Sequence, residues 1–417
     1  MLRFLTAGES HGQALVVIVE GLPAGLPVTV EDVQAQLARR RLGYGRGPRM
    51  RFEADEVTLL AGVRHGRTLG SPVAIEIANT EWSRSDKWHA EMSPAPGATE
   101  APLTAPRPGH ADLAGMQKYG FTDARDVLER ASARETAARV AAGSLARLLL
   151  GHLGVSLVSH VIQLGPVRAE PSRRPGPDDL DDVDASEVRC ADPDGAAEMV
   201  TAIKDAARDG DSLGGIVEVL AFGVPVGLGS HVHWDRKLDG RLAQALMSIQ
   251  AVKGVEVGDG FDVAGRRGSE AHDAISWDAE AGAYRRHTTR AGGLEGGITT
   301  GEVVVAHVAM KPLATLNRPS LGTVDTATKA DTVSFKERTD VTAVPAMGVV
   351  AEAMAALVLA DEAVRKFGGD SLPELVRNHR TYLDQVAEHA VARADEGDRG
   401  SVNWDAGEAF DDGSAGG

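Results

Sequence analysis

Two segments that are predicted to be helical are apolar on almost every side, and this feature limits the possible folds more than any other. Residues 137–150 read AARVAAGSLARLLL, and residues 349–360 read VVAEAMAALVLA. A helix at a protein surface normally shows a broad polar stripe, and neither segment has one. Both helices must therefore be covered on more than one side, and their many small residues allow other elements to approach closely.

Segments that alternate in the manner of β-strands flank these helices in the sequence. Residues 2–28 and 52–80 alternate apolar and polar side chains, and Gly, Pro and Asn close each run. Further helices are predicted over residues 29–41, with Thr29 as the N-cap, and over residues 236–252. This pattern favours an α+β fold, a β-α-β sandwich in which antiparallel sheets enclose buried apolar helices.

The chain is predicted to form a single domain over residues 1–393, because the β segments at its two ends are expected to share one core with helices over residues 133–154 and 347–369. Residues 169–196 form an acidic, Pro-containing insertion that is predicted to be peripheral. Residues 394–417 form an acidic, Gly-rich tail, and this composition predicts disorder.

Composition excludes several classes of protein. A net charge of −16 over 417 residues argues against a nucleic-acid binder. Cys190 is the only cysteine, so neither an intramolecular disulfide framework nor a Cys-based metal site is possible. No apolar run approaches the roughly 20 residues that span a bilayer, and no signal peptide is recognisable. We therefore expect a cytoplasmic protein without membrane contact.

Residues 8–12 read GESHG and match G-x-S-x-G, the pattern of a nucleophilic serine on a sharp turn. The motif lies at the first turn of the chain, where no sheet precedes it, and the β-branched run after it predicts a strand rather than a helix. Three interpretations stay open: a hydrolase elbow with Ser10 as nucleophile, a structural glycine turn, and a loop that brings His11 to a substrate.

Against the acidic background, several segments contain basic side chains in a context that could bind a ligand. Guanidinium groups match the geometry of carboxylates and phosphates, so these segments together predict a pocket for a small, multiply charged anion. The segments are residues 39–51, 104–120, 129–140, 292–316 and 334–346.

The spacing of the arginines limits which of them can meet one ligand. Arg39, Arg40 and Arg41 leave a helix about 100° apart, so not all three can face the same ligand. Arg130 and Arg134 share one face if their helix has already begun.

Histidines outside the first motif have two different contexts. His110 follows Arg107 by three residues in a Pro-Gly turn, where it could act as an acid beside a phosphate. His231 and His233 would lie on one face of a strand in SHVHWD, a spacing that can bind metal. Because no third ligand is evident, a structural role is favoured there and no metal site is predicted.

Taken together, these segments resemble the chorismate synthase family. The resemblance rests on GESHGQAL, RRRLGYGRGPRM, RPGHADLAGMQKYG, RASARETAARVAAG, ALMSIQAVKGVE, AGGLEGGITTGEVVVAHVAMKP and RTDVTAVPA, in the family's order, from residue 1 to about residue 370. It implies a lyase that converts 5-enolpyruvylshikimate 3-phosphate to chorismate and phosphate by 1,4-anti elimination. It also implies reduced FMN as cofactor, without net redox change, and a homotetramer.

The resemblance also implies roles for individual residues. His11 would protonate the departing phosphate with Ser10 as relay, His110 would protonate the reduced flavin, and Asp340 would help to take up the substrate proton. The implied substrate clamp consists of Arg40, Arg46, Arg107, Arg134 and Arg338. The implied cofactor contacts are Arg40, Arg46, Arg130, Ala131, Ser132, Gln250, Ala251, Gly296, Lys311, Pro312, Leu313, Ala314, Thr315 and Arg338.

The source of electrons for the flavin is a further expectation. The resemblance implies that NADPH supplies them, through Arg40 and Arg46 or through an external flavin reductase. Three rivals are a serine hydrolase that uses Ser10, a non-catalytic anion- or RNA-binding protein, and a flavin oxidoreductase with net hydride transfer. A fluorophosphonate probe, RNA retention and the consumption of reductant would distinguish them.

Overall fold

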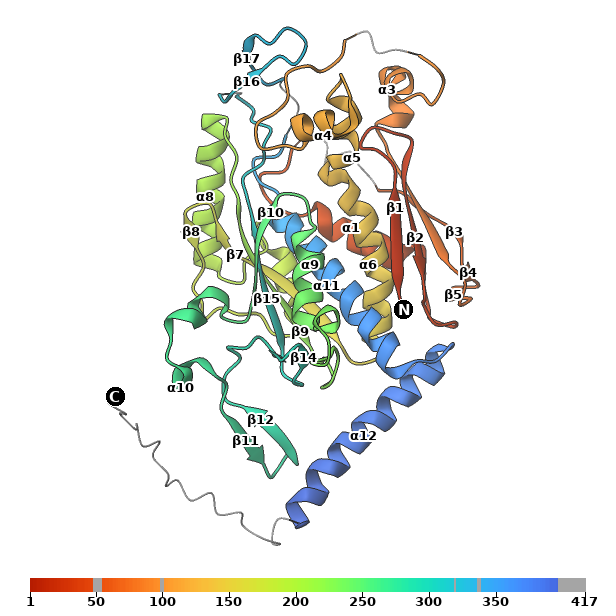
Figure 1. The fold of residues 1–417 in the computed structure, drawn as a ribbon, viewed down its shortest axis with the longest axis vertical. Helices are drawn as coiled ribbons and strands as arrows, with labels where there is room; N and C mark the ends of the chain where they lie inside the picture. Colours follow the sequence, from red (N-terminus) through yellow and green to blue (C-terminus); the bar gives the residue numbers. More distant parts are fainter. Residues whose placement is uncertain (48–54, 98–100, 319, 336–338, 397–417) are drawn as a thin grey trace, which may run out of the picture.

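Two antiparallel sheets form the outer layers of the fold, and helices fill the space between them (Figure 1). The computed structural model describes residues 1–47, 55–97, 101–318, 320–335 and 339–396. The first sheet has the strand order β1-β2-β6-β3, with β1 at Arg3–Ala7, β2 at Ala14–Glu20, β3 at Val57–Ala61 and β6 at Val73–Ala78. The second has the order β10-β15-β9-β7-β8, with β7 at Ser156–Leu164, β8 at Val167–Arg168, β9 at Gly215–Phe222, β10 at Val252–Val257 and β15 at Val304–Met310.

The two apolar helices lie in the middle of this sandwich, as their composition predicts. Helix α6 (Thr136–Gly151) packs on the first sheet, α11 (Val344–Phe367) packs on the second, and the two helices pack on each other. They approach so closely that a Cβ on Gly143 would lie 2.4 Å from the Cβ of Ala353. Helices α1 (Val30–Arg41) and α9 (Leu238–Met247) complete the helical layer. The predicted α+β sandwich is confirmed.

Local signals explain where these elements begin and end. The Thr29 side chain accepts a hydrogen bond from the backbone N–H of Asp32, and the Asp32 side chain accepts one from the backbone N–H of Thr29. Thr29 is therefore the N-cap of α1, as predicted, and forms a capping box with Asp32. Ala14–Glu20 pairs with Arg3–Ala7, so the GESHG segment is the loop of a β-hairpin. Gly368 follows α11 with a φ of 63°, a conformation that glycine adopts at little cost.

A buried charge cluster ties α11 to its neighbours. Glu352, which is fully buried on α11, accepts hydrogen bonds from Arg39 at 2.7 and 3.0 Å and from Arg147 at 2.9 Å. It also accepts from Arg189 at 3.1 Å. Burial opposes ionisation, but the three guanidinium charges outweigh it and hold the pKa of Glu352 well below its ordinary value.

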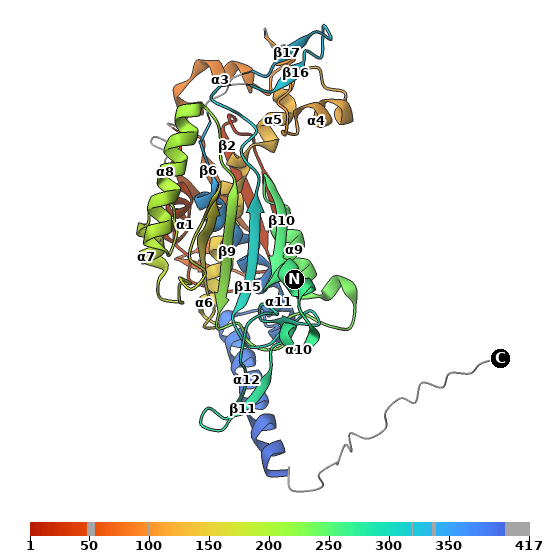
Figure 2. The ribbon, with the colours of Figure 1, turned by 90° about the vertical axis from the view of Figure 1, so that its left-hand side faces the viewer.

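The insertion at residues 169–196 is less peripheral than predicted. It contains α7 (Leu180–Ala185) and the start of α8 (Pro193–Asp209) (Figure 2). Helix α8 packs beside β8. Arg189 of the insertion is completely buried and reaches Glu352. An acidic composition therefore did not keep this segment at the surface, because one of its few basic side chains completes a charge cluster in the core.

Helix α12 (Leu372–Glu396) leaves the body of the protein and extends beyond the end of the sandwich (Figure 1). This helix was not predicted. It includes the first three residues of the tail, which was expected to begin at residue 394. The rest of the tail, residues 397–417, lies outside the described residues. Within the described part of the chain, α11 alone is long and apolar enough to cross a membrane. All of its apolar window is buried inside the protein, so the core accounts for its composition.

Shorter elements surround the sandwich. Near one end of the sandwich lie α3 (Asp86–Glu91), α4 (Asp112–Tyr119), α5 (Arg125–Ala131) and the hairpin of β16 (Gly322–Val324) and β17 (Asp331–Val333) (Figure 1). The others are β4 (Val63–Arg64), β5 (Arg67–Thr68), α10 (Gly268–Ala271), β11 (Ile275–Asp278), β12 (Ala283–Arg286), β13 (Leu294–Glu295) and β14 (Ile298–Thr299), with short 3-10 helices η1 (Trp82–Arg84), η2 (Ala133–Glu135), η3 (Trp234–Arg236) and η4 (Gly260–Gly265).

Candidate active site

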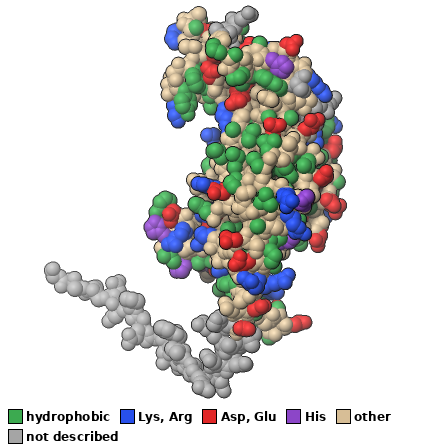
Figure 3. All heavy atoms as spheres, turned by 90° about the vertical axis from the view of Figure 1, so that its right-hand side faces the viewer, with side chains coloured by type: hydrophobic (Ala, Val, Ile, Leu, Met, Phe, Trp, Pro, Cys, Tyr) green, Lys and Arg blue, Asp and Glu red, His purple; other side chains and the backbone are tan. Residues whose placement is uncertain are grey.

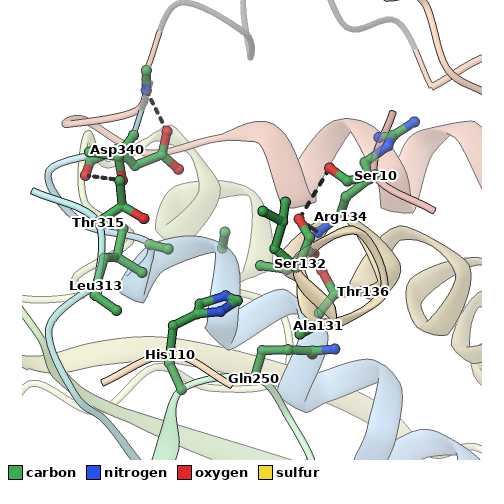
Figure 4. A pocket seen from close by; sticks show the side chains of 18 of the residues that line it. Ser10, His110, Ala131, Ser132, Arg134, Thr136, Gln250, Leu313, Thr315 and Asp340 are labelled. Carbon is green, nitrogen blue, oxygen red and sulfur yellow. Dashed lines mark hydrogen bonds between the residues drawn. The ribbon is translucent and has the colours of Figure 1, made fainter. Parts of the chain in front are cut away.

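A cavity of about 770 Å³ opens between the first hairpin, the start of α6, α11 and the segment after β15. Figure 4 shows Ser10, Ser132 and Arg134 on one side of it, Thr315 and Asp340 on the other, and the ring of His110 between them. Among the described residues, six cationic side chains and two acidic ones line the cavity, so it favours an anion despite the acidic net charge of the chain. The cationic residues are Arg40, Arg46, Lys87, Arg107, Arg134 and Lys311; the acidic ones are Glu81 and Asp340.

Ser10 and His11 lie on the loop of the first hairpin, and both are buried at the edge of the cavity. The Ser132 hydroxyl donates to Ser10 Oγ over 3.2 Å. His11 Nδ1 lies 2.9 Å from Glu129 Oε1, and Nε2 lies 3.4 Å from Glu81 Oε2. Ser10 has a strand on either side rather than a strand and a helix, so the hydrolase elbow is not formed.

His110 belongs to a compact group with Arg107 and Asp112. The His110 backbone N–H donates to the Arg107 carbonyl over 3.2 Å, which closes the predicted Pro-Gly turn. Asp112 is fully buried, accepts from Arg107 at 2.8 and 3.0 Å, and also bonds His110 Nδ1. Burial opposes ionisation, but these hydrogen bonds outweigh it, and the pKa of Asp112 lies well below its ordinary value. A proton on Nδ1 is thus held by Asp112, which leaves Nε2 for a ligand.

The substitution Asp112→Asn is expected to reduce kcat by about 10²-fold, because an amide cannot hold both the guanidinium and the imidazole in place. Steady-state turnover at saturating substrate measures this effect. Since Asp112 is buried, the thermal midpoint of unfolding should fall as well, so the rate is measured well below that temperature. A rate within about twofold of the unsubstituted protein would show that His110 does not depend on this carboxylate.

Arg40 and Arg134 share the buried carboxylate of Asp55. Arg40 lies 3.9 Å from it and donates to Thr136 Oγ1 at 3.0 Å, whereas Arg134 forms an ion pair with Asp55 and donates to Asn79 Oδ1 at 2.9 Å. Both arginines are at most 5% exposed and line the cavity. Their side chains are therefore fixed in advance of any ligand.

The adjacent arginines of α1 separate as the helical spacing predicts. Arg40 lines the cavity, while Arg39 turns to Glu352 and to Asp184, which it reaches over 2.5 Å. Arg46 also lines the cavity and lies 3.2 Å from Asp340. Asp340 further accepts a hydrogen bond from the backbone N–H of Gly47 over 2.6 Å.

Most of the predicted site residues meet at this one cavity. Those that line it are Ser10, His11, Arg40, Arg46, Arg107, His110, Ala131, Ser132, Arg134, Gln250, Ala251, Lys311, Leu313, Ala314, Thr315 and Asp340. Pro312 and Gly296 do not line it, and Gly296 lies in the turn between β13 and β14. The predicted Arg338 lies outside the described residues.

Two expectations about side-chain direction are wrong. Helix α5 ends at Ala131, so Arg130 and Arg134 do not share a helical face. Arg130 instead donates to the Gly8 carbonyl at 2.9 Å and holds the first hairpin. His231 and His233 lie in a bend before η3 rather than on a strand. No group of three metal-ligating side chains occurs among the residues that the structure describes.

Sequence reasoning missed the residues that hold the predicted ones. Asp55, Glu81 and Trp88 carried no recognisable signal, because their partners lie far away in the sequence. Asp112 lies two residues from His110, and a search for carboxylates beside candidate acids would have found it. Glu129 lies inside a recognised segment, but its partner His11 is 118 positions away.

Comparisons with known proteins identify the family to which this chain is similar. The sequence model of the family described as chorismate synthase matches residues 2–364. The chorismate synthase of Salinispora tropica is 60% identical over 395 residues, which cover 93% of this chain and 99% of that protein. The chorismate synthase of Thermobifida fusca is 59% identical over 396 residues, with the same coverage.

This chain belongs to the chorismate synthase family. A solved structure titled "Crystal Structure of Chorismate Synthase" matches with a TM-score of 0.74 and 40% identity, over 93% of this chain and 98% of that one. As a member of the family, the protein is a lyase that converts 5-enolpyruvylshikimate 3-phosphate to chorismate, the final step of the shikimate pathway. Members of the family use reduced FMN.

The cavity residues fit a flavin nucleotide together with an anionic substrate. Its volume lies within the range of cofactor sites, about 300–1,000 Å³. An apolar wall suits a flat aromatic ring, and the cations suit phosphates. Gln250 Oε1 is buried and lacks a hydrogen-bond partner among the described residues, so it can accept from a ligand N–H. The apolar wall consists of Ile249, Met310, Leu313, Met347 and Val350.

Proposed function

We propose that His11 and His110 are the two proton-transfer groups of this chorismate synthase and that the arginines around them bind the substrate. The observation that carries the proposal is that both histidines line the same cation-lined cavity. His11 Nε2, on the cavity side of the ring, donates its proton to the departing phosphate. Ser10, which is hydrogen-bonded to Ser132, relays protons within the same loop.

The substrate carries a phosphate and two carboxylates, and four described arginines provide for these charges. Hydrogen bonds between charged groups contribute about 1.5–3 kcal/mol each before desolvation is counted. Each of these arginines already has a carboxylate or a hydroxyl beside it, so it is oriented before the substrate arrives. We assign the clamp to Arg40, Arg46, Arg107 and Arg134, together with Arg338 beyond the described residues.

The remaining lining residues hold the flavin in this proposal. When bound, reduced FMN supplies electron density to the reacting system without net redox change. His110 holds a proton at Nε2 toward the cofactor, and Asp340 accepts the substrate proton at a carboxylate oxygen. The flavin contacts are proposed for Ala131, Ser132, Gln250, Ala251, Lys311, Leu313, Ala314 and Thr315, which line the cavity, and for Arg338; Arg130, Pro312 and Gly296 would contribute from outside the lining.

NADPH is proposed as the source of the electrons that reduce the flavin, either at Arg40 and Arg46 or through an external flavin reductase. Two cationic side chains beside an open cavity suit the phosphates of a nicotinamide nucleotide. A cytoplasmic location, where both FMN and NADPH are available, is part of the same proposal.

We also propose that the chain assembles as a homotetramer. The outer face of the first sheet carries no helix in Figure 1, and hydrophobic side chains gather on the corresponding face in Figure 3. Leu5, Ile18 and Leu60 are 70%, 43% and 54% exposed on its strands. Exposed apolar patches of this kind are typical of protein–protein contacts. The mass of the particle in solution, measured by light scattering, tests this assembly.

An anaerobic assay tests the proposed chemistry. Protein, photoreduced FMN and 5-enolpyruvylshikimate 3-phosphate are mixed, and chorismate absorbance and phosphate release are followed together. We expect equal amounts of both products and many turnovers for each reduced flavin. Consumption of one reductant per product would instead indicate net hydride transfer, and product formation without flavin would contradict the cofactor's role.

A further inference from the structure

We propose that Glu129 and Trp88 are positioning residues that fix the ring of His11, so that its Nε2 faces the substrate. The inference rests on the proposed role of His11 as the acid, and it concerns two residues to which no role has been given. Glu129 determines which ring nitrogen faces the cavity, and Trp88 determines the plane of the ring.

Glu129 holds the His11 loop at three atoms. Its backbone carbonyl accepts from the N–H of Ser10 at 2.9 Å, and its Oε2 accepts from the backbone N–H of His11 at 2.8 Å. Its carboxylate also lies 2.9 and 3.1 Å from His11 Nδ1. One buried side chain therefore fixes both the backbone and the ring of the residue, although 118 positions separate the two in the chain.

The charge of Glu129 is maintained by its surroundings. Burial opposes ionisation, but the hydrogen bonds and charge of His11, with the charge of Arg125, outweigh it and lower the pKa of Glu129 below its ordinary value. Arg125 Nη1 lies 3.1 Å from Glu129 Oε1. An ionised carboxylate can only accept at Nδ1, so Nδ1 carries a proton and cannot serve as a hydrogen-bond acceptor.

Trp88 fixes the plane of the imidazole. The rings of His11 and Trp88 are stacked, with centroids 3.8 Å apart and an angle of 15° between their planes. Lys87 Nζ and the Arg125 guanidinium lie 4.7 and 5.2 Å from the indole centroid. Since α3, which carries Trp88, is far from the hairpin in sequence, this contact is made only in the folded protein.

Because Glu129 binds His11 Nδ1 and Trp88 fixes the plane of the imidazole ring, the direction of Nε2 is fixed as well. Nε2 lies 3.4 Å from Glu81 Oε2, and both His11 and Glu81 line the cavity, whereas Glu129 does not. Nε2 is therefore the nitrogen that meets the substrate phosphate. A proton carried at Nε2 is the one that a general acid at this position donates.

A double-mutant cycle tests this inference in the full-length protein with photoreduced FMN. Glu129→Gln keeps the size of the side chain but removes its charge, and we expect kcat to fall by about 10-fold or more while KM for substrate changes less than about threefold. Because Glu129 acts through His11, the variant that combines His11→Ala and Glu129→Gln should be no slower than His11→Ala alone. Trp88→Leu should lower kcat, and Trp88→Phe, which keeps a stacking ring, should restore most of it.

Asp126→Asn is the matched control, because it removes one negative charge from the same helix at an exposed position and should leave kcat unchanged. Circular dichroism and FMN binding verify that each variant is folded. If His11→Ala is slow but both Glu129→Gln and Trp88→Leu turn over at the normal rate, the inference is wrong and the role of His11 stands. Additive losses in the double variant would also overturn it. A normal rate for His11→Ala would overturn the acid assignment itself, and this inference with it.

Discussion

Replacing His11 or His110 by alanine is expected to slow chorismate formation by about 10²–10⁴-fold, the range for general acid–base groups. Both rings line the same cavity, and each has a buried carboxylate at Nδ1: Glu129 for His11 and Asp112 for His110. Each ring therefore presents Nε2 as its reactive nitrogen. The measurement is kcat in the anaerobic assay, with phosphate release followed in parallel.

The two variants should differ in how they respond to the cofactor. His110→Ala should alter the flavin absorbance in the presence of substrate, whereas His11→Ala should leave it close to normal, because His11 is assigned to the phosphate. His231→Ala serves as a control, since His231 is exposed and does not line the cavity. Normal rates for both variants would refute the proton-transfer roles while leaving the family assignment intact.

Glu352→Gln is expected to lower the free energy of unfolding by about 3–5 kcal/mol, the usual cost of removing one partner from a buried ion pair. The substitution would leave Arg39, Arg147 and Arg189 with only Asp184 to balance them in the core. Urea denaturation at pH 7, followed by circular dichroism, measures the loss. Because Arg39 precedes Arg40, a weaker cluster should also loosen the end of α1 that reaches the cavity.

The effect of this substitution should depend on pH. The folded pKa of Glu352 is lowered, so its stabilising contribution is complete above the unfolded value of about 4.3 and is lost as the pH falls toward the folded value. The difference in stability between the unsubstituted protein and the Glu352→Gln variant should therefore shrink below about pH 4. Asp205→Asn, which breaks an exposed pair with Arg208, should cost less than about 1 kcal/mol. If Glu352→Gln lowered the free energy of unfolding by as little as Asp205→Asn does, the structural role of the cluster would be contradicted.

The predictions that succeeded depend on short stretches of sequence. The absence of a polar stripe predicted that α6 and α11 are buried, and Thr29 predicted the start of α1. The β-branched run after GESHG predicted a strand, which argued against the hydrolase elbow, and the β1–β2 pairing excludes that elbow. Each of these signals acts within a few turns of helix or a few residues of strand, where backbone geometry alone relates one side chain to the next.

The predictions that failed depend on where a segment stops or on a distant partner. Arg130 and Arg134 diverge because α5 ends between them, and the insertion is partly buried because Arg189 finds Glu352. Helix α12 was also missed, although its amphipathic pattern is no weaker than that of α1, which was predicted.

Local sequence patterns were enough to predict the layers of the sandwich, the helix that carries the adjacent arginines, and the loops that carry His11 and His110. The folded chain was needed to show that Arg40 faces the cavity while Arg39 faces Glu352, and that Glu129 and Trp88 enclose His11. The two cases differ because periodic burial is set by neighbours along the chain, whereas the direction of a charged side chain is set by the opposite charge nearest to it in space. For Arg39 that charge comes from a residue 313 positions away.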